Sequence, residues 1–205
     1  GDVGGLVGYN ALTDAEIIDT YASGSVTGND DVGGLVGENQ GTVTDGFWDK
    51  DTTGRDTGVG KDGKTADVTG LTTTESLGES NYGDLDFTED WYMVDEKTRP
   101  FLRTEWSPAL RNAHHLQLVA MKPDAATYHL AEDLDLSRPL QEANRAGMWA
   151  TNATDLTHIT GDGFAPIASF GGTLDGNGRT VSNLVIDRSV TASVGLFDTI
   201  KSGAT

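Results

Sequence analysis

The nine-residue phrase DVGGLVGYN at residues 2–10 returns almost letter for letter as DVGGLVGEN at residues 31–39. The offset between the two copies is 31 − 2 = 29 residues, and seven consecutive letters, DVGGLVG, are identical. Repeats with a period of about 20–50 residues are typical of solenoids, propellers and arrays, in which each repeat is one supersecondary unit. The repeated phrase therefore restricts the chain to folds that stack similar units.

Each copy reads as short β-prone runs separated by Gly, Asn and Asp, which favour turns. After the shared phrase the two copies align at an offset of 26, because the first copy carries three extra residues in ALTDAE. Insertions of this kind are tolerated in loops. If each copy forms one layer, strands stack about 4.8 Å apart and equivalent residues lie over one another. The expected stacked pairs are Leu6 over Leu35, Ile17 over Val43 and Tyr21 over Phe47.

Glycine accounts for 27 of the 205 residues, about twice the usual share of ~7%. Glycine permits tight corners and disfavours long helices. We expect an all-β chain, a right-handed parallel β-solenoid with an aromatic, loop-rich capping segment and one short helix. The repeat positions expected to build the corners and the core are Gly4, Gly5, Leu6, Gly8, Tyr21, Gly33, Gly34, Leu35, Gly37 and Phe47.

Three segments differ in composition. Residues 1–48 hold the repeats, residues 49–111 form a loop-rich aromatic cap or junction, and residues 112–205 open a second solenoid unit. The polar stretch at 49–65 is expected to be loop, and HHLQLVAM at 114–121 a short helix. The last turn of a solenoid exposes apolar core and an unpaired strand edge, so it needs a cover. The aromatic residues expected to supply that cover are Tyr82, Phe87, Trp91, Tyr92, Phe101 and Trp106.

The stretches VGGLVGYN, IIDTYASGSVTG and VGGLVGENQGTVTDGFWD resemble the GLUG repeat. That repeat occurs in large bacterial and archaeal surface proteins, including filamentous-haemagglutinin-like adhesins and some secreted peptidases. YHLAEDLDLS through VGLFDTI is similar to the stretch that opens such a solenoid, and FWDKDTTG through TRPFLR resembles the segment that closes one. The resemblance implies a β-solenoid at the cell surface or outside the cell, and it brings no shared catalytic residues.

The order of these parts departs from the usual one, because the closing half precedes the opening half. The chain is either a fragment that spans the end of one solenoid and the start of the next, or a subunit whose C-terminal half docks onto a GDVGGLVG end, its own or a neighbour's. Reading VGLFDTIKSGAT directly into GDVGGLVGYN restores a plausible coil. Docking onto a neighbour would be heterologous, and such contacts give filaments when they do not close.

The chain carries 32 Asp and Glu against 14 Lys and Arg, a formal charge of −18. Such a surface repels nucleic acid and anionic membranes and attracts cations. No apolar stretch approaches the ~18 residues of a membrane span, so we expect no membrane insertion within this segment. The absence of Cys excludes disulfides, thiolate metal sites and Cys nucleophiles.

Two stretches could hold a cation. DKDTTGRD places Asp49, Asp51 and Asp56 around a glycine, which partly resembles a calcium loop without its closing Glu. DGNG offers Asp175 and Asn177. A polar turn is the alternative for both stretches and is the favoured reading. We expect no cofactor, with calcium as the one candidate ion.

We do not expect an enzyme. Asp133 and Asp135 would share one face of a strand, about 6.6–7 Å apart, near the spacing of inverting glycosidases, but an ordinary solvated face is favoured. The adjacent His114 and His115 point to different faces, which suits structural roles better than one metal. Asn152 begins an N-glycosylation sequon, which matters only if the producing cell glycosylates.

The expected function is that of a structural module in a cell-surface or secreted protein, acting in adhesion or as a stalk. The alternatives are a filament subunit that associates with itself head to tail, and a β-helix that binds or cleaves polysaccharide. A glycan or protein receptor is left unspecified.

Overall fold

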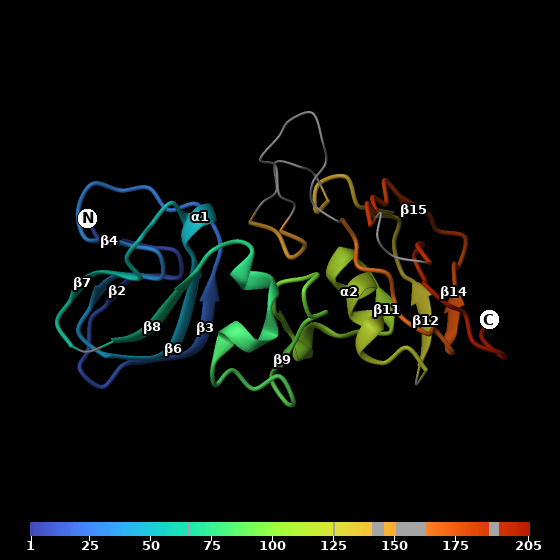
Figure 1. Cartoon of the computed structure of the whole chain (residues 1–205), viewed down its shortest axis with the longest axis horizontal. Coiled ribbons are helices and arrows are strands. Elements are labelled where there is room, and N and C mark those ends of the chain that lie inside the picture. The colour runs from blue at the N-terminus through green and yellow to red at the C-terminus, as the bar shows by residue number, and fades with distance from the viewer. Residues whose placement is uncertain (65, 125, 141–145, 151–162, 189–192) are drawn as a thin grey trace. The chain divides into compact units, whose positions relative to one another are not determined.

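The computed structural model describes residues 1–205 except 65, 125, 141–145, 151–162 and 189–192. The chain is mostly β with little helix (Figure 1). It packs as two compact units, Gly1–Leu85 and Asp86–Thr205. The boundary between the units falls inside the segment 49–111 that the sequence assigns to a cap or junction. Each unit is described by itself.

The first unit consists of short parallel strands in three layers. The first layer contains β1 (Val3–Gly4), β2 (Val7–Asn10) and β3 (Glu16–Ala22), the second contains β4 (Val32–Gly33), β5 (Val36–Asn39) and β6 (Thr42–Asp49), and the third contains β7 (Val59–Asp62) and β8 (Ala66–Leu71). Every pairing between layers is parallel, in the orders β1-β4, β2-β5-β7 and β3-β6-β8. Each layer therefore repeats the course of the one before it.

The register between the layers places like residues over like. Val7 pairs with Val36, and Val36 pairs with Val59. Strands β3 and β6 pair Ile17 with Val43 and Tyr21 with Phe47, the pairs that the alignment of the two copies gives. The backbone amide of Leu6 donates to the carbonyl of Leu35 at 2.9 Å. The offset is 29 residues in β2 and 26 in β3, so the three extra residues of the first copy lie between these strands.

The third layer lies partly where the sequence predicts loop. Strand β7 has the sequence VGKD and follows the helix α1 (Lys50–Thr53). Only one of its residues, Val59, is apolar, so hydrophobic alternation does not reveal the strand. Backbone pairing to β5 defines it. The expectation of loop is therefore wrong at β7, where a glycine-rich polar stretch completes the stack.

The second unit combines short strands with short helical segments, among them the 3₁₀ turn η3 (Arg103–Glu105). Its strands are β9 (Trp91–Tyr92), β10 (Phe101–Leu102), β11 (Ala109–Leu110), β12 (Thr127–Leu130), β13 (Leu134–Asp135), β14 (Thr173–Asp175) and β15 (Val181–Ser182). The sheets β11-β12-β14 and β13-β15 are parallel, whereas β9 and β10 pair antiparallel. The helix expected at 114–121 is found as α2 (Ala113–Gln117) followed by the 3₁₀ turn η4 (Leu118–Met121).

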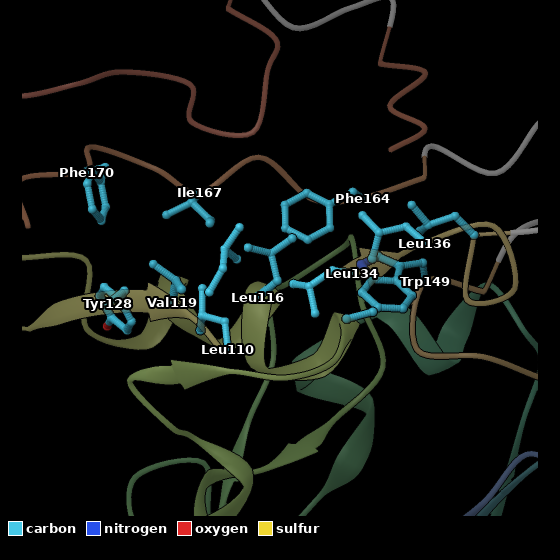
Figure 2. Packing of buried hydrophobic residues seen from close by; sticks show 13 residues of the cluster. Leu110, Leu116, Val119, Tyr128, Leu134, Leu136, Trp149, Phe164, Ile167 and Phe170 are labelled. Atoms are coloured by element: carbon cyan, nitrogen blue, oxygen red, sulfur yellow. The ribbon is translucent and has the colours of Figure 1, made fainter. Parts of the chain in front are cut away.

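The core of the second unit is formed by buried side chains from α2, the parallel strands and the segment 164–170 (Figure 2). Trp149 stacks on Phe164, with ring centroids 6.2 Å apart. The buried residues labelled in the figure are Leu110, Leu116, Val119, Tyr128, Leu134, Leu136, Trp149, Phe164, Ile167 and Phe170. Burial of this apolar area is the main force that holds the short elements together.

The aromatic residues expected to form one cap are divided between the units. Tyr82 belongs to the first unit, where it ends the 3₁₀ turn η2 (Glu79–Tyr82), which follows the 3₁₀ turn η1 (Glu75–Leu77). Phe101 contacts the rings of His114 and Trp149, and Trp106 contacts Tyr128. Their ring contacts therefore lie within the second unit.

Candidate functional site

The glycines of the repeated phrase lie where backbone meets backbone. A Cβ atom on Gly4 would overlap the carbonyl oxygens of Val7 and Leu35, and a Cβ atom on Gly33 would overlap the corresponding carbonyls one layer later. A Cβ atom on Gly37 would likewise overlap the carbonyl of Gly8. These close approaches exclude any side chain. The phrase is therefore repeated because each layer makes the same tight corner.

The indole ring of Trp48 requires a second set of glycines. The ring is buried and its Nε1–H donates to the carbonyl of Arg55 at 2.8 Å. A Cβ atom on Gly34 would lie 2.6 Å from Nε1 of Trp48, and Gly58 and Gly70 approach the six-membered part of the ring equally closely. Trp48 pairs with Ala22 in the first layer. One large ring thus fills the volume that three glycines leave open.

A ladder of amides runs through the three layers at the ends of β2, β5 and β7. The side-chain amide of Asn10 donates to Oδ1 of Asn39 at 2.8 Å, and that of Asn39 donates to Oδ1 of Asp62 at 3.0 Å. Asn39 also binds the backbone amide and carbonyl of Gly41, both at 3.2 Å. Asn10 and Asn39 are buried, so these hydrogen bonds satisfy polar groups that water cannot reach.

The stacked pair Tyr21 and Phe47 is completed by Tyr82. The ring of Tyr82 lies 5.9 Å from that of Tyr21, edge to face, and 5.2 Å from that of Phe47. Its hydroxyl donates to the carbonyl of Ser76 at 2.7 Å. Tyr82 is fully buried. Residues 72–85 are therefore anchored on the aromatic column of the first unit.

The predicted calcium residues Asp49, Asp51 and Asp56 do not converge. Asp49 is the N-cap of α1, and its Oδ1 accepts hydrogen bonds from the amides of Asp51 and Thr52 and from Oγ1 of Thr73. Asp51 accepts from the amide of Thr73 at 2.8 Å, and Asp56 is exposed. The carboxylates of Asp49 and Asp51 thus serve backbone and hydroxyl donors, and calcium binding here stays a prediction.

Among the described residues, a different trio brings carboxylates together. Oxygens of Asp2, Asp31 and Glu38 all lie within 4.8 Å of one another. Lys61 of the third layer binds Glu38 at 2.9 Å. This hydrogen bond raises the pKa of Lys61 and, together with a second one from Gln40, lowers the pKa of Glu38. The ammonium group thus already compensates part of the negative charge.

The candidate catalytic residues Asp133 and Asp135 bind residues that flank the neighbouring strand β15. Asp133 accepts from the amide of Thr180 at 2.8 Å. Asp135 accepts from the side-chain amide of Asn183 at 2.8 Å and from the amide of Ser137, and these bonds lower its pKa. A general acid needs a raised pKa, so Asp135 is unsuited to that role. The contacts favour the structural reading.

The remaining sequence candidates serve local structure. His114 Nδ1 lies 2.7 Å from Glu105 Oε2, while His115 Nδ1 lies 3.2 Å from the carbonyl of Ala109. Asp175 accepts from the amide of Asn177 at 2.8 Å in a turn with positive φ at Asn177. The sequon at Asn152 lies outside the described residues.

A hollow in the second unit is lined in part by Tyr92, Lys97, Arg188 and Asp198. Burial raises the pKa of Tyr92 to about 12. Arg188 donates to the carbonyls of Gly163 and Phe164, and Asp198 accepts from the amide of Ser169. Arg188 and Asp198, two charged residues that line the hollow, therefore hold backbone segments in place.

The amide ladder, the role of Trp48 and the acidic trio are not predicted from the sequence. The alignment does place Asn10 over Asn39, which is the signal for the ladder. Its third member, Asp62, follows Asn39 by 23 residues rather than 29, so no constant spacing reveals it. Among the described residues, no helix has the length and apolar character needed to cross a membrane.

Comparison with known proteins gives one family match and two relatives. A stretch of 86 residues is 44% identical to a Gly-rich membrane protein of Evansella cellulosilytica, covering 38% of this chain and 10% of that protein. A stretch of 78 residues is 40% identical to halomucin of Haloquadratum walsbyi, covering 38% of this chain and 1% of halomucin. The chain thus spans a small part of the curated relatives it matches. No solved structure matches it significantly. Residues 1–27, which contain the whole first layer, match the model of the GLUG motif.

Proposed function

We propose that the chain is a structural module of a surface or extracellular protein, in which Gly1–Leu85 is a right-handed parallel β-solenoid that serves as part of a stalk. The observation that carries the proposal is the register of the three layers. Val7, Val36 and Val59 lie in one column, and Ile17, Val43 and Ala66 lie in another. Columns in which equivalent residues of successive layers lie over one another are characteristic of a solenoid.

The stack supports a mechanical role. Backbone hydrogen bonds connect each layer to the next, and the amide ladder and the aromatic column pass through the same layers. Parallel strand connections are right-handed in nearly all proteins, which supports the handedness. The three extra residues within ALTDAE lie between β2 and β3, and Leu12 of this stretch is 65% exposed. Such loops can vary without disturbing the stack.

The comparisons support the location. The GLUG match covers the first layer, and one relative is named as a membrane protein and the other as halomucin. The net charge of −18 favours solubility and disfavours nucleic acid as a partner. The contacts of Asp133 and Asp135 with the strand β15 region support a structural role rather than an enzymatic one.

The location can be tested with the parent protein in intact producing cells. An epitope tag inserted after Leu12 places the label in an exposed loop. We expect antibody to bind the tag on intact cells and external protease to remove it. A tag that reacts only after lysis would contradict the proposal. A tag on a known intracellular protein of the same cells controls for leakage.

Stalk and adhesin roles predict different results with the purified chain. A stalk holds another part of the protein away from the surface, so deletion of residues 1–85 from the parent should shorten the surface structure, and added purified chain should not compete with cell attachment. An adhesive module would make the purified chain an inhibitor of attachment. We expect no inhibition.

A further inference from the structure

The first layer of the first unit presents open strand edges. Strands β1, β2 and β3 stand at the ends of their sheets, because within the part of the chain that the structure describes each pairs with one strand only. Open edges offer amides and carbonyls to a further strand. Of the seven large apolar side chains exposed in the described part of the chain, four lie on this layer: Leu6, Tyr9, Leu12 and Ile18.

The last segment of the second unit presents another edge, which no strand among the described residues covers. Residues 196–201 run parallel to 167–170 through the bridges Ile167–Phe197 and Phe170–Ile200. Val194 and Ile200 are two more of the seven exposed apolar side chains, 49% and 62% exposed. Beside them lies an apolar hollow, lined by Phe170, Leu174, Phe197, Ile200, Ala204 and Thr205.

The two edges belong to the same hydrogen-bonding pattern. In the first unit Val7 pairs with Val36 and its amide donates to the carbonyl of Leu35 at 3.2 Å. In the second unit Ile167 pairs with Phe197 and its amide donates to the carbonyl of Leu196 at 2.9 Å. In both steps the amide of the earlier layer binds the carbonyl that precedes its paired residue in the later layer.

This pattern fixes the direction of the open groups. The carbonyl of Leu35 faces the layer before it, so the carbonyl of Leu6, at the same position one layer earlier, faces the open side. The amides of Val7 and Val36, which occupy the same position in successive layers, each face the layer that follows. Phe197 occupies the equivalent position in the last layer of its unit. The amide of Phe197 therefore points to its own open side. One edge offers an acceptor where the other offers a donor.

We propose that the first layer of one copy docks onto the segment 194–205 of a second copy, with Val7 opposite Phe197 and the Phe197 amide donating to the Leu6 carbonyl. The inference rests on the layered module proposed above and extends its layer-to-layer interface between chains. Gly195 and Leu196 then face Gly5 and Leu6, so that like residues stack as they do within the first unit. The exposed apolar side chains of both edges become buried.

The two edges are different surfaces, so the association is heterologous and produces rings or open chains of copies. Each copy carries a charge of −18, which opposes contact between copies. Salt reduces this repulsion, because the Debye length falls from about 10 Å at 0.1 M to about 3 Å at 1 M ionic strength. Association is therefore stronger at high salt.

The test uses the purified chain of residues 1–205 in sedimentation velocity and light scattering, over a range of concentrations at about 0.1 M and 1 M NaCl. We expect species larger than the 21.6 kDa monomer that increase with concentration and salt. Ile18→Lys blocks the first edge and Ile200→Lys blocks the second. Each variant alone is expected to stay monomeric, whereas an equimolar mixture forms a 1:1 dimer, because each partner keeps one free edge.

Leu102→Lys is the matched control, since Leu102 is the seventh exposed apolar side chain and lies on neither edge. It should assemble like the wild type. If Ile18→Lys loses its β circular dichroism, Leu12→Lys replaces it, because Leu12 lies in a loop. A wild-type chain that stays monomeric, or a mixture that stays monomeric, overturns the docking. These results do not depend on where the protein is located in the cell. A failure of docking would therefore not contradict the proposed surface location, which the epitope experiment tests separately.

Discussion

Asn39 receives a hydrogen bond from the side-chain amide of Asn10 at 2.8 Å and passes one to Asp62 at 3.0 Å. The two contacts join three layers of the first unit through side chains, at positions where the chain leaves one strand and turns toward the next. Amide side chains can do this because each carries both a donor and an acceptor. Asp62 ends the ladder with a carboxylate, which only accepts.

Asn39→Ala should destabilise the first unit strongly. The substitution leaves the Asn10 amide and both backbone groups of Gly41 without their partners, and an unsatisfied buried group costs about 1–3 kcal/mol. Urea unfolding followed by circular dichroism measures the loss. Asn10→Ala is the control, because Asn10 ends the ladder and makes one of these bonds. A loss for Asn10→Ala as large as that for Asn39→Ala would contradict the proposed ladder.

Gly34→Ala should destabilise the chain by about 1–3 kcal/mol, because the added methyl group overlaps the buried indole ring of Trp48. Gly24→Ala is the matched control. Nothing lies within 4 Å of a Cβ atom at Gly24, so we expect a neutral change or a gain of at most about 1 kcal/mol. Urea unfolding followed by circular dichroism measures both changes. Equal effects of the two substitutions on the free energy of unfolding would contradict a tight fit between Gly34 and the ring of Trp48.

Asp49→Ala should destabilise the chain by about 1–3 kcal/mol through loss of the α1 cap and of the bond from Thr73. Asp49→Asn keeps an acceptor oxygen and should cost less than half as much. Both effects should persist in EDTA, because hydrogen bonds rather than a cation explain them. A thermal shift that appears only with calcium, and not with an equal ionic strength of NaCl, would instead support the calcium site.

The repeated phrase determines much of the first unit. Identical letters at an offset of 29 identify the layers, and the pairs Ile17–Val43 and Tyr21–Phe47 follow from the alignment alone. The glycine corners follow as well, because only glycine permits such close backbone approach. Strand β7 does not follow, since its stabilisation comes from backbone pairing to β5, and VGKD carries no hydrophobic period.

The contacts of side chains distant in sequence are the part that the sequence does not determine. Asp49 in DKDTTGRD has the composition of a calcium loop, yet its oxygen caps a helix of four residues. The sequence predicts Tyr82 in one cap with the other aromatic residues, whereas it packs on Tyr21 and Phe47. The contacts of Asp49 and of Tyr82 both depend on the position at which residues 72–82 pack against the layers of the first unit. No local sequence pattern specifies that position.

A column of carboxylates on the first unit gives a prediction about pH. Asp19 and Asp45 occupy equivalent positions in β3 and β6, both with positive φ. The pKa of Asp45 is raised, mainly by burial and further by the negative charges of Asp84, Asp67 and Asp19. A raised carboxyl pKa in the folded state means that folding favours the protonated form. This contribution to stability is therefore fully present below the unfolded pKa of ~3.9 and is lost as the pH rises through the folded value.

Asp45→Asn should therefore raise the urea midpoint at pH 7, because asparagine retains the neutral form and tolerates positive φ. The gain over the wild type should shrink as the pH falls through the raised folded pKa of Asp45 and should vanish below about 4, where Asp45 is neutral in both the folded and the unfolded state. The gain should also shrink in salt, which screens the repulsion between carboxylates. Asp14→Asn is the control, because it makes the same change in net charge at an exposed loop position. An equal gain from Asp14→Asn, or a gain at Asp45 that does not depend on pH, would show that net charge rather than this column sets the effect.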